Sequence, residues 1–155
     1  MPKNDLNHHA KVILSEYIPI GHYAVQASRP SGGWSYYSAP EWFTQGLQEY
    51  DAIFHTTESN RTTTAAELLK WARRNRETFT CCTSGISIGD VYNGGATFMA
   101  FLAAEFGEDV HTRLLRSSAE TFEAALLDAA KPYTMSELFD RFRAWLDQTV
   151  VAAAL

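Results

Sequence analysis

The chain has 155 residues, of which 46% are apolar and 20% charged, a composition typical of a single globular domain with a buried core. The formal net charge of -5 provides no basic surface for nucleic acid or an anionic membrane, so neither is expected as a partner. No stretch approaches the roughly 20 apolar residues of a membrane span, and the first residues lack the apolar core of a signal peptide. We therefore expect one domain over residues 1–155, located in the cytoplasm.

The N-terminal part of the chain combines a helix with an irregular segment. Apolar residues at helical spacing predict a first helix that ends at Pro19 and Gly21. Residues 21–38 are predicted to form an irregular loop, because proline and glycine turn signals gather around residues 30–33. At most short strands are expected there, within residues 21–37.

The rest of the chain is predicted to be helical, so the fold class is mostly α. In a capping box, a Ser or Thr accepts a hydrogen bond from the first helical turn while a Glu three residues later reaches back. Four pairs have this spacing: Ser38–Glu41, Thr64–Glu67, Ser117–Glu120 and Thr134–Glu137. The predicted helices cover residues 39–55, 64–79, 91–106, 109–116, 118–130 and 134–152. Residues 98–106, apolar on nearly all sides, are expected to be the central buried helix, with Gly107 as its stop.

The two cysteines of the chain, Cys81 and Cys82, are adjacent. A disulfide between neighbouring residues is rare, and two cysteines cannot build the disulfide framework of a small secreted domain. We therefore expect two reduced thiols. A thiol nucleophile assisted by His22 or His55 is the alternative, but no local signature supports it.

Residues 40–50, which read PEWFTQGLQEY, are the most informative stretch. They resemble the segment of gluzincin metallopeptidases, in the peptidase-MA-like branch, whose Glu at the position of Gln45 is the third zinc ligand. Residues 92–98 and the apolar run that ends at Gly107 are similar to the next helix of that family. The resemblance covers roughly residues 6–147 and implies the helical half of a gluzincin-like zinc-peptidase fold.

The other hallmark of that family is HExxH on a helix, where two histidines bind zinc and the Glu activates a bound water. The corresponding stretch is residues 8–12, which read HHAKV. His8 matches the first ligand, His9 stands at the general base and Val12 at the second ligand. Valine has no lone pair for a metal, and Gln45 offers only a neutral carbonyl. The resemblance therefore implies no metal, no cofactor and no conventional zinc-peptidase activity.

The resemblance also implies a cleft between the first helix and the helix over residues 39–55. In the family, a small sheet precedes the HExxH helix and forms the upper wall of the cleft. That helix begins near residue 5 here, so the cleft is open on one side, or a second subunit or a partner protein covers it. Four polar residues are expected on its floor: His8, Gln45, Glu49 and Tyr92.

The candidate site residues fall into two groups. Acid–base or polarising roles are assigned to His8, Glu49 and Tyr92. Ligand-binding roles are assigned to Gln45, Trp42, Tyr50, His22 and Trp34. For the aromatic residues of this region, core packing is the competing interpretation to a stacking surface.

Three functions are consistent with these features. The preferred one is a non-proteolytic protein whose repurposed cleft binds a small molecule or a peptide, because Trp42 and Gly46 maintain the scaffold while the metal ligands are lost. The second is a metal-free enzyme that acts on a small-molecule substrate in an apolar pocket. The third is a regulatory pseudoenzyme that binds a partner protein, or a second copy as a homodimer, through the open cleft.

Overall fold

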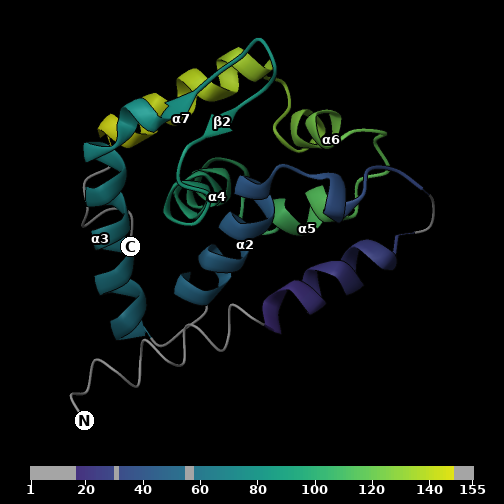
Figure 1. Cartoon of the computed structure of the whole chain (residues 1–155), viewed down its shortest axis with the longest axis horizontal. Coiled ribbons are helices and arrows are strands. Elements are labelled where there is room, and N and C mark those ends of the chain that lie inside the picture. Colours follow the sequence, from purple (N-terminus) through teal and green to yellow (C-terminus); the bar gives the residue numbers. More distant parts are fainter. Residues whose placement is uncertain (1–16, 30–31, 55–57, 149–155) are drawn as a thin grey trace.

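The computed structural model describes residues 17–29, 32–54 and 58–148, and the fold is mostly helical, as predicted. Helices α2 (Glu41–Phe54) and α4 (Asn93–Phe106) lie at the centre of the molecule (Figure 1). The other helices surround them: α3 (Glu58–Arg74), α5 (Val110–Leu115), α6 (Phe122–Ala129) and α7 (Met135–Gln148). Residues 17–27 are also helical, and η1 (Tyr36–Ser38) and η2 (Arg76–Thr78) are short 3-10 turns. None of the described helices is long and apolar enough to cross a membrane.

Helix α4 is the buried centre of the fold, as its apolar sequence predicts. Phe98, Met99, Phe101 and Leu102 are fully buried. The helix ends at Gly107, which has a φ of 95° and donates its N–H to the carbonyl of Ala103 at 3.0 Å. This conformation is one that glycine adopts without a steric penalty, so the predicted stop is confirmed.

Helices α2 and α4 cross where two glycines face each other. A Cβ atom built on Gly46 would overlap the Cα and carbonyl carbon of Gly95, and one built on Gly95 would overlap the carbonyl oxygen of Trp42. The two backbones are therefore in direct contact, and no larger residue fits at either position. This contact fixes the distance and rotation of α2 relative to the central helix.

Aromatic rings fill the space around this crossing. Trp42 packs edge-on against Phe98 of α4 and Phe122 of α6, with centroids 5.4 and 5.6 Å away. Phe142 of α7 packs against Phe98 at 5.0 Å and against Phe79 of β1 at 5.0 Å. Edge-on pairs of this kind stabilise a core beyond the area that they bury. They join α2, α4, α6 and α7 into one core.

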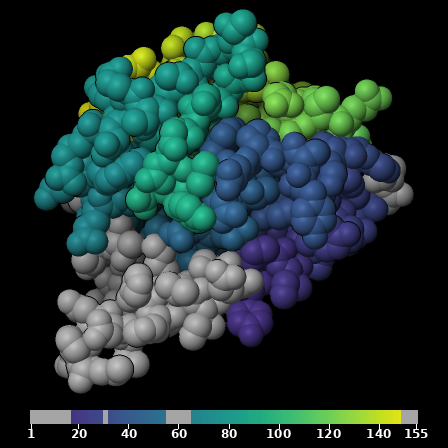
Figure 2. All heavy atoms as spheres, in the orientation of Figure 1, coloured from purple at the N-terminus to yellow at the C-terminus, as the bar shows by residue number. Residues whose placement is uncertain are grey.

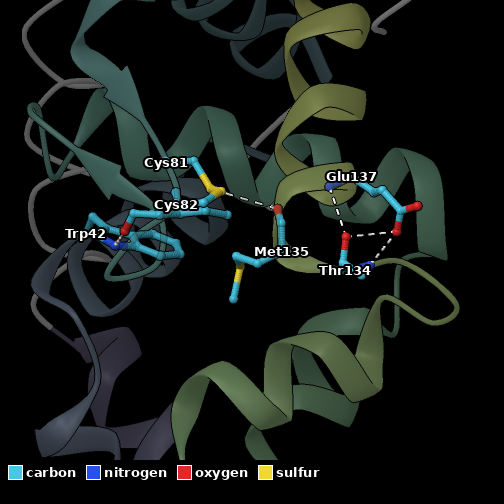
Figure 3. Close-up of a disulfide and its surroundings, with 7 residues drawn as sticks. Trp42, Cys81, Cys82, Thr134, Met135 and Glu137 are labelled. Atoms are coloured by element: carbon cyan, nitrogen blue, oxygen red, sulfur yellow. Dashed lines mark hydrogen bonds between the residues drawn. A yellow bond between two sulfur atoms is a disulfide. The ribbon is translucent and has the colours of Figure 1, made fainter.

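Strands β1 (Phe79–Thr80) and β2 (Ser87–Ile88) pair antiparallel and cover one side of this core. The loop between them carries a disulfide between Cys81 and Cys82, where the sequence favoured two reduced thiols (Figure 3). The indole N–H of Trp42 donates to the carbonyl of Ile86 at 3.1 Å and holds the same loop against α2.

The structure corrects the prediction for residues 21–38. The chain is helical through residue 27, with no end at Pro19 or Gly21, and the irregular part begins only after it. The short strands expected within residues 21–37 are absent from the described part of that range. Side-chain contacts of this helical segment with α2 and η1, described below, oppose the helix-breaking tendencies of Pro19 and Gly21, which are about 3 and 1 kcal/mol in a helix interior.

One of the four predicted capping boxes is confirmed. The N–H of Glu137 donates to Thr134 Oγ1 at 3.3 Å, and the N–H of Thr134 donates to the Glu137 carboxylate at 2.8 Å (Figure 3). The hydrogen bonds to Thr134 hold the pKa of the Glu137 carboxyl below its ordinary value.

The other three predicted boxes are wrong. Thr64 lies inside α3, which begins at Glu58 and ends at Arg74, so the predicted helix 64–79 is shifted toward the N-terminus. Helix α6 is capped by Thr121, whose hydroxyl accepts from the N–H of Ala124 at 3.1 Å, and not by Ser117. The hydroxyl of Ser38 donates to the carbonyl of Ser35 instead of capping α2. Spacing alone does not distinguish a cap from a helix interior or a turn.

We predict that Gly46→Ala lowers the free energy of unfolding by about 3 kcal/mol or more, since overlapping backbone atoms cannot rotate away. Gly21→Ala is the matched control, because Gly21 also lies in a helix but a Cβ atom built on it would meet no atom within 4 Å. That change should raise stability by up to about 1 kcal/mol. Urea unfolding followed by circular dichroism measures both. Equal stability of the two variants would contradict the close approach of α2 and α4.

A second prediction concerns the start of α7. Thr134→Ala should cost about 1 kcal/mol, because it removes the hydroxyl that accepts from the first helical turn. Ser38→Ala changes the same kind of exposed hydroxyl where it caps no helix, and should cost less than about 0.5 kcal/mol. Thermal unfolding of the two variants beside the wild type gives the comparison, and a larger loss for Ser38→Ala would contradict the assignment of the caps.

Candidate functional site

A group of polar side chains lies between the helical segment 17–27, η1 and α2. We call it the polar cluster, and its members are His22, Gln26, Tyr36, Gln48 and Asp51. His22, Gln26 and Tyr36 are buried, and the side chain of Asp51 is 19% exposed. Burying a polar group costs free energy unless the group is hydrogen-bonded, so each hydrogen bond in this cluster offsets part of that cost.

Helical spacing brings the cluster together from both sides. His22 and Gln26 are four residues apart, so both side chains point to the same face of the segment 17–27. Gln48 and Asp51 are three residues apart on α2 and share one face of that helix. Tyr36 reaches the cluster from η1, which follows the segment 17–27 in the chain.

His22 links a carboxylate to a phenol. Its Nε2 lies 2.6 Å from Asp51 Oδ2, and its Nδ1 lies 3.4 Å from the hydroxyl of Tyr36. A carboxylate accepts hydrogen bonds, so Nε2 carries a proton and the neutral imidazole has Nδ1 as its acceptor. The Tyr36 hydroxyl has two acceptors within reach, this Nδ1 and the backbone carbonyl of Thr44 at 3.5 Å. Asp51 thus sets the tautomer of His22, which leaves Nδ1 as one acceptor for Tyr36.

Tyr36 is a member of the cluster whose pKa is raised. Burial raises the pKa of its phenol above the ordinary value, and the nearby charge of Asp51 acts in the same direction. A hydrogen bond with the Gln48 side chain lowers the pKa and offsets part of this effect. Tyr36 therefore stays protonated at neutral pH and serves as a hydrogen-bond donor.

Gln26 has one satisfied and one unsatisfied end. Its Oε1 accepts from the backbone N–H of Tyr36 at 2.6 Å, which fixes the orientation of the amide, because the reversed amide would place two donors together. Its Nε2 is buried and meets no acceptor among the residues that the structure describes, and the residue as a whole is only 5% exposed. The indole Nε1 of Trp34 is also buried and has no hydrogen-bond partner within the described part of the chain. The amide of Gln26 thus presents a donor to which none of the described residues supplies an acceptor.

The structure disperses the predicted site residues. His22 belongs to the polar cluster, and His8 lies outside the described residues. Gln45 and Glu49 are half-buried one turn apart on α2. Tyr92 precedes α4 and is 51% exposed, and no hydrogen bond among the described residues joins it to the polar cluster.

The predicted ligand-binding aromatic residues are core residues. Trp34 packs edge-on against Phe43 and Phe122 at centroid distances of 5.7 and 5.5 Å, and Trp42 lies at the centre of the aromatic core. Tyr50 is buried against Phe54 and His111. Their positions agree with the packing interpretation and leave no open ring face for a ligand.

Sequence reasoning missed four members of the cluster: Gln26, Tyr36, Gln48 and Asp51. One signal was available, because His22 and Gln26 have the i, i+4 spacing of two side chains on one helical face. That signal has meaning only if residues 21–27 are helical, and Pro19 and Gly21 argued against a helix there. The partners Tyr36 and Asp51 are 14 and 29 residues from His22, so no local pattern connects them.

Within the described residues, no group of three or more His, Cys, Asp or Glu side chains is arranged to hold a metal ion. A scan against known protein families, a search of curated proteins and a search of solved structures find no match to this chain. Function is therefore inferred from the chemistry of the polar cluster.

We predict that Tyr36 makes the fold sensitive to alkaline pH. The pKa of Tyr36 is raised in the folded state, so its contribution is fully present below the unfolded pKa of about 10 and is lost as the pH rises above it. The stability difference between wild type and Tyr36→Phe should therefore shift in favour of the variant from about pH 9 to pH 11. Urea unfolding at several pH values measures it. Tyr37→Phe, at an exposed neighbouring ring, is the control, and equal pH profiles for all three proteins would refute the prediction.

Proposed function

We propose that this chain is a non-proteolytic binding protein that takes a small molecule or a peptide group at the polar cluster. The observation that carries the proposal is the buried Nε2 of Gln26, for which residues 17–29, 32–54 and 58–148 supply no acceptor. A buried donor without a partner costs about 1–3 kcal/mol. An acceptor atom of a ligand would remove this cost and would be bound in a fixed direction, because Tyr36 holds the other end of the amide.

The surroundings of Gln26 favour a neutral ligand with a carbonyl oxygen. Asp51 lies in the same cluster as Gln26, and Glu49 is two residues before Asp51 on α2. No Lys or Arg occurs in α2 or in residues 17–28. The guanidinium of Arg29 is engaged by the carbonyls of Ser117 and Trp34 at 3.2 and 2.6 Å. An anionic ligand would be repelled by a carboxylate of this cluster, whereas the oxygen of a neutral amide or ketone would not.

This proposal includes the resemblance to gluzincin peptidases. In it, the polar cluster takes the place of the peptidase-like cleft, and the neutral side chain of Gln26 suits an uncharged ligand better than a dication. The proposal also keeps the cytoplasm as the location, although a disulfide such as Cys81–Cys82 is uncommon there.

The test is a thermal-shift screen of the full chain against uncharged amides, ketones and short blocked peptides. Gln26→Glu keeps the acceptor for Tyr36 but replaces the unpaired donor by a carboxylate oxygen, so shifts seen with wild type should disappear. Gln45→Glu makes the same chemical change on α2 at a side chain that is not a member of the polar cluster, and should keep the shifts. Stabilisation that is lost in Gln45→Glu and kept in Gln26→Glu would place the site elsewhere. No stabilisation by any carbonyl compound would show that only water occupies the donor.

A metal-free enzyme is the second candidate. The observation that favours it is the series of contacts from Asp51 to His22 and from His22 to Tyr36. A carboxylate that orients an imidazole, which in turn contacts a hydroxyl, is the arrangement of an activated nucleophile or general acid. Wild type and Tyr36→Phe incubated with the compounds that stabilise the protein would be compared by mass spectrometry. A product formed only by wild type would favour this candidate over simple binding.

A further inference from the structure

The helical segment 17–27 buries its polar side chains His22 and Gln26 and exposes several large apolar ones, although its Val25 packs against the core. His22 and Gln26 are buried against α2 and η1, as described above. The opposite face exposes Tyr17 by 68%, Ile20 by 66% and Tyr23 by 49%. A surface helix normally has the reverse distribution, because apolar groups are stabilised by burial. Figure 2 shows this segment in purple at the surface, beside the blue atoms of η1 and α2.

The exposed face has the spacing of a helix-pairing seam. Tyr17, Ile20, Ala24 and Ala27 are separated by three, four and three residues, and all four are exposed. This spacing places them in one stripe along the helix, as at the a and d positions of a coiled coil. The two ends of the stripe differ in side-chain size: Tyr17 and Ile20 are large, and Ala24 and Ala27 are small. We call these four residues the seam.

We propose that the seam pairs with the seam of a second copy of this chain, with the two helices antiparallel. In that arrangement Tyr17 lies opposite Ala27 of the second copy, and Ile20 lies opposite Ala24. Each large side chain then meets a small one, and the two-fold axis repeats both pairs, so the same surface is used on both chains. A parallel arrangement would place large residues against large ones and leave the alanines unfilled.

The charge of the chain supports a second copy as the occupant. Two chains with a formal net charge of -5 repel each other over most of their surface. Residues 17–28 contain no Asp, Glu, Lys or Arg, so the seam is a place where two copies meet without like charges in contact. Charge-depleted surfaces rich in tyrosine are typical of protein interfaces.

The available area is sufficient for a weak dimer. Tyr37 is 80% exposed and packs beside Tyr23 with ring centroids 5.5 Å apart, which widens the apolar face next to the seam. Burying these two rings together with Tyr17 and Ile20 would remove roughly 500 Å² per chain. For two chains this is about 1,000 Å², the lower limit of a specific interface.

The experiment measures the oligomeric state of the full chain by light scattering and sedimentation across a dilution series. Wild type should show a mass twice the 17.4 kDa of one chain at high concentration and should dissociate on dilution. Ile20→Lys and Ala24→Glu each place a charge on the seam, and each variant alone should be monomeric. Their equimolar mixture should form a one-to-one dimer. Position 20 of the Ile20→Lys chain then faces position 24 of the Ala24→Glu chain, so the two introduced charges are opposite in sign. At the symmetry-related contact, Ala24 of the first chain still faces Ile20 of the second. Circular dichroism checks that both exposed substitutions keep the fold.

The outcomes separate the alternatives. A wild type that is monomeric at every concentration overturns the proposal, as does a dimer that neither substitution dissociates. Dissociation by both substitutions without recovery in the mixture refutes the antiparallel pairing of residues 20 and 24. Tyr92→Glu, at an exposed tyrosine outside the seam, is the control and should dimerise as wild type does. None of these results depends on ligand binding at Gln26, so the two proposals fail independently.

Discussion

The close approach of Gly46 and Gly95 determines how the rest of the molecule is arranged. With both Cβ atoms absent, the backbones of α2 and α4 touch, and the rotation of α2 about its axis is fixed. One face of α2 then packs Trp42 and Phe43 into the aromatic core. The face that carries Gln48 and Asp51 is turned away from α4. The location of the polar cluster is thus a consequence of a contact on the other side of the helix.

A consequence of this arrangement is that two different forces hold the two sides of α2. Toward α4 the attachment is apolar and extensive, and each buried ring there contributes to stability in proportion to its area. Toward the segment 17–27 the direct hydrogen bond is that of His22 with Asp51, while Gln26 accepts from the backbone of Tyr36 in η1, and bonds of this kind typically contribute about 1 kcal/mol each. The segment 17–27 is therefore the part of this assembly whose attachment depends most on additional contacts.

The sequence predicted those elements whose patterns are determined locally. Residues 98–106 are apolar nearly all round, and Gly107 ends them, so α4 and its burial were predictable. Thr134 and Glu137 satisfied each other within one turn, so the start of α7 was predictable as well. The segment 17–27 was not, because Pro19 and Gly21 are local stop signals while its stabilising partners are distant in the chain. Of the proposed site, only His22 was identified, since Tyr36 and Asp51 meet it through the packing of three separate elements.

Binding at the inner face of the segment 17–27 and binding at its outer face are thermodynamically linked, because both involve the same helix. A partner that covers the seam stabilises the helix, and the same helix carries the buried donor of Gln26. Two ligands that bind the same helix on opposite faces are linked in their affinities. If dimerisation changes the affinity for a ligand at Gln26 by some factor, the ligand must change the affinity of dimerisation by the same factor. A short helix with polar contacts inside and an apolar seam outside can therefore couple two binding events without any change in the core built on α2 and α4.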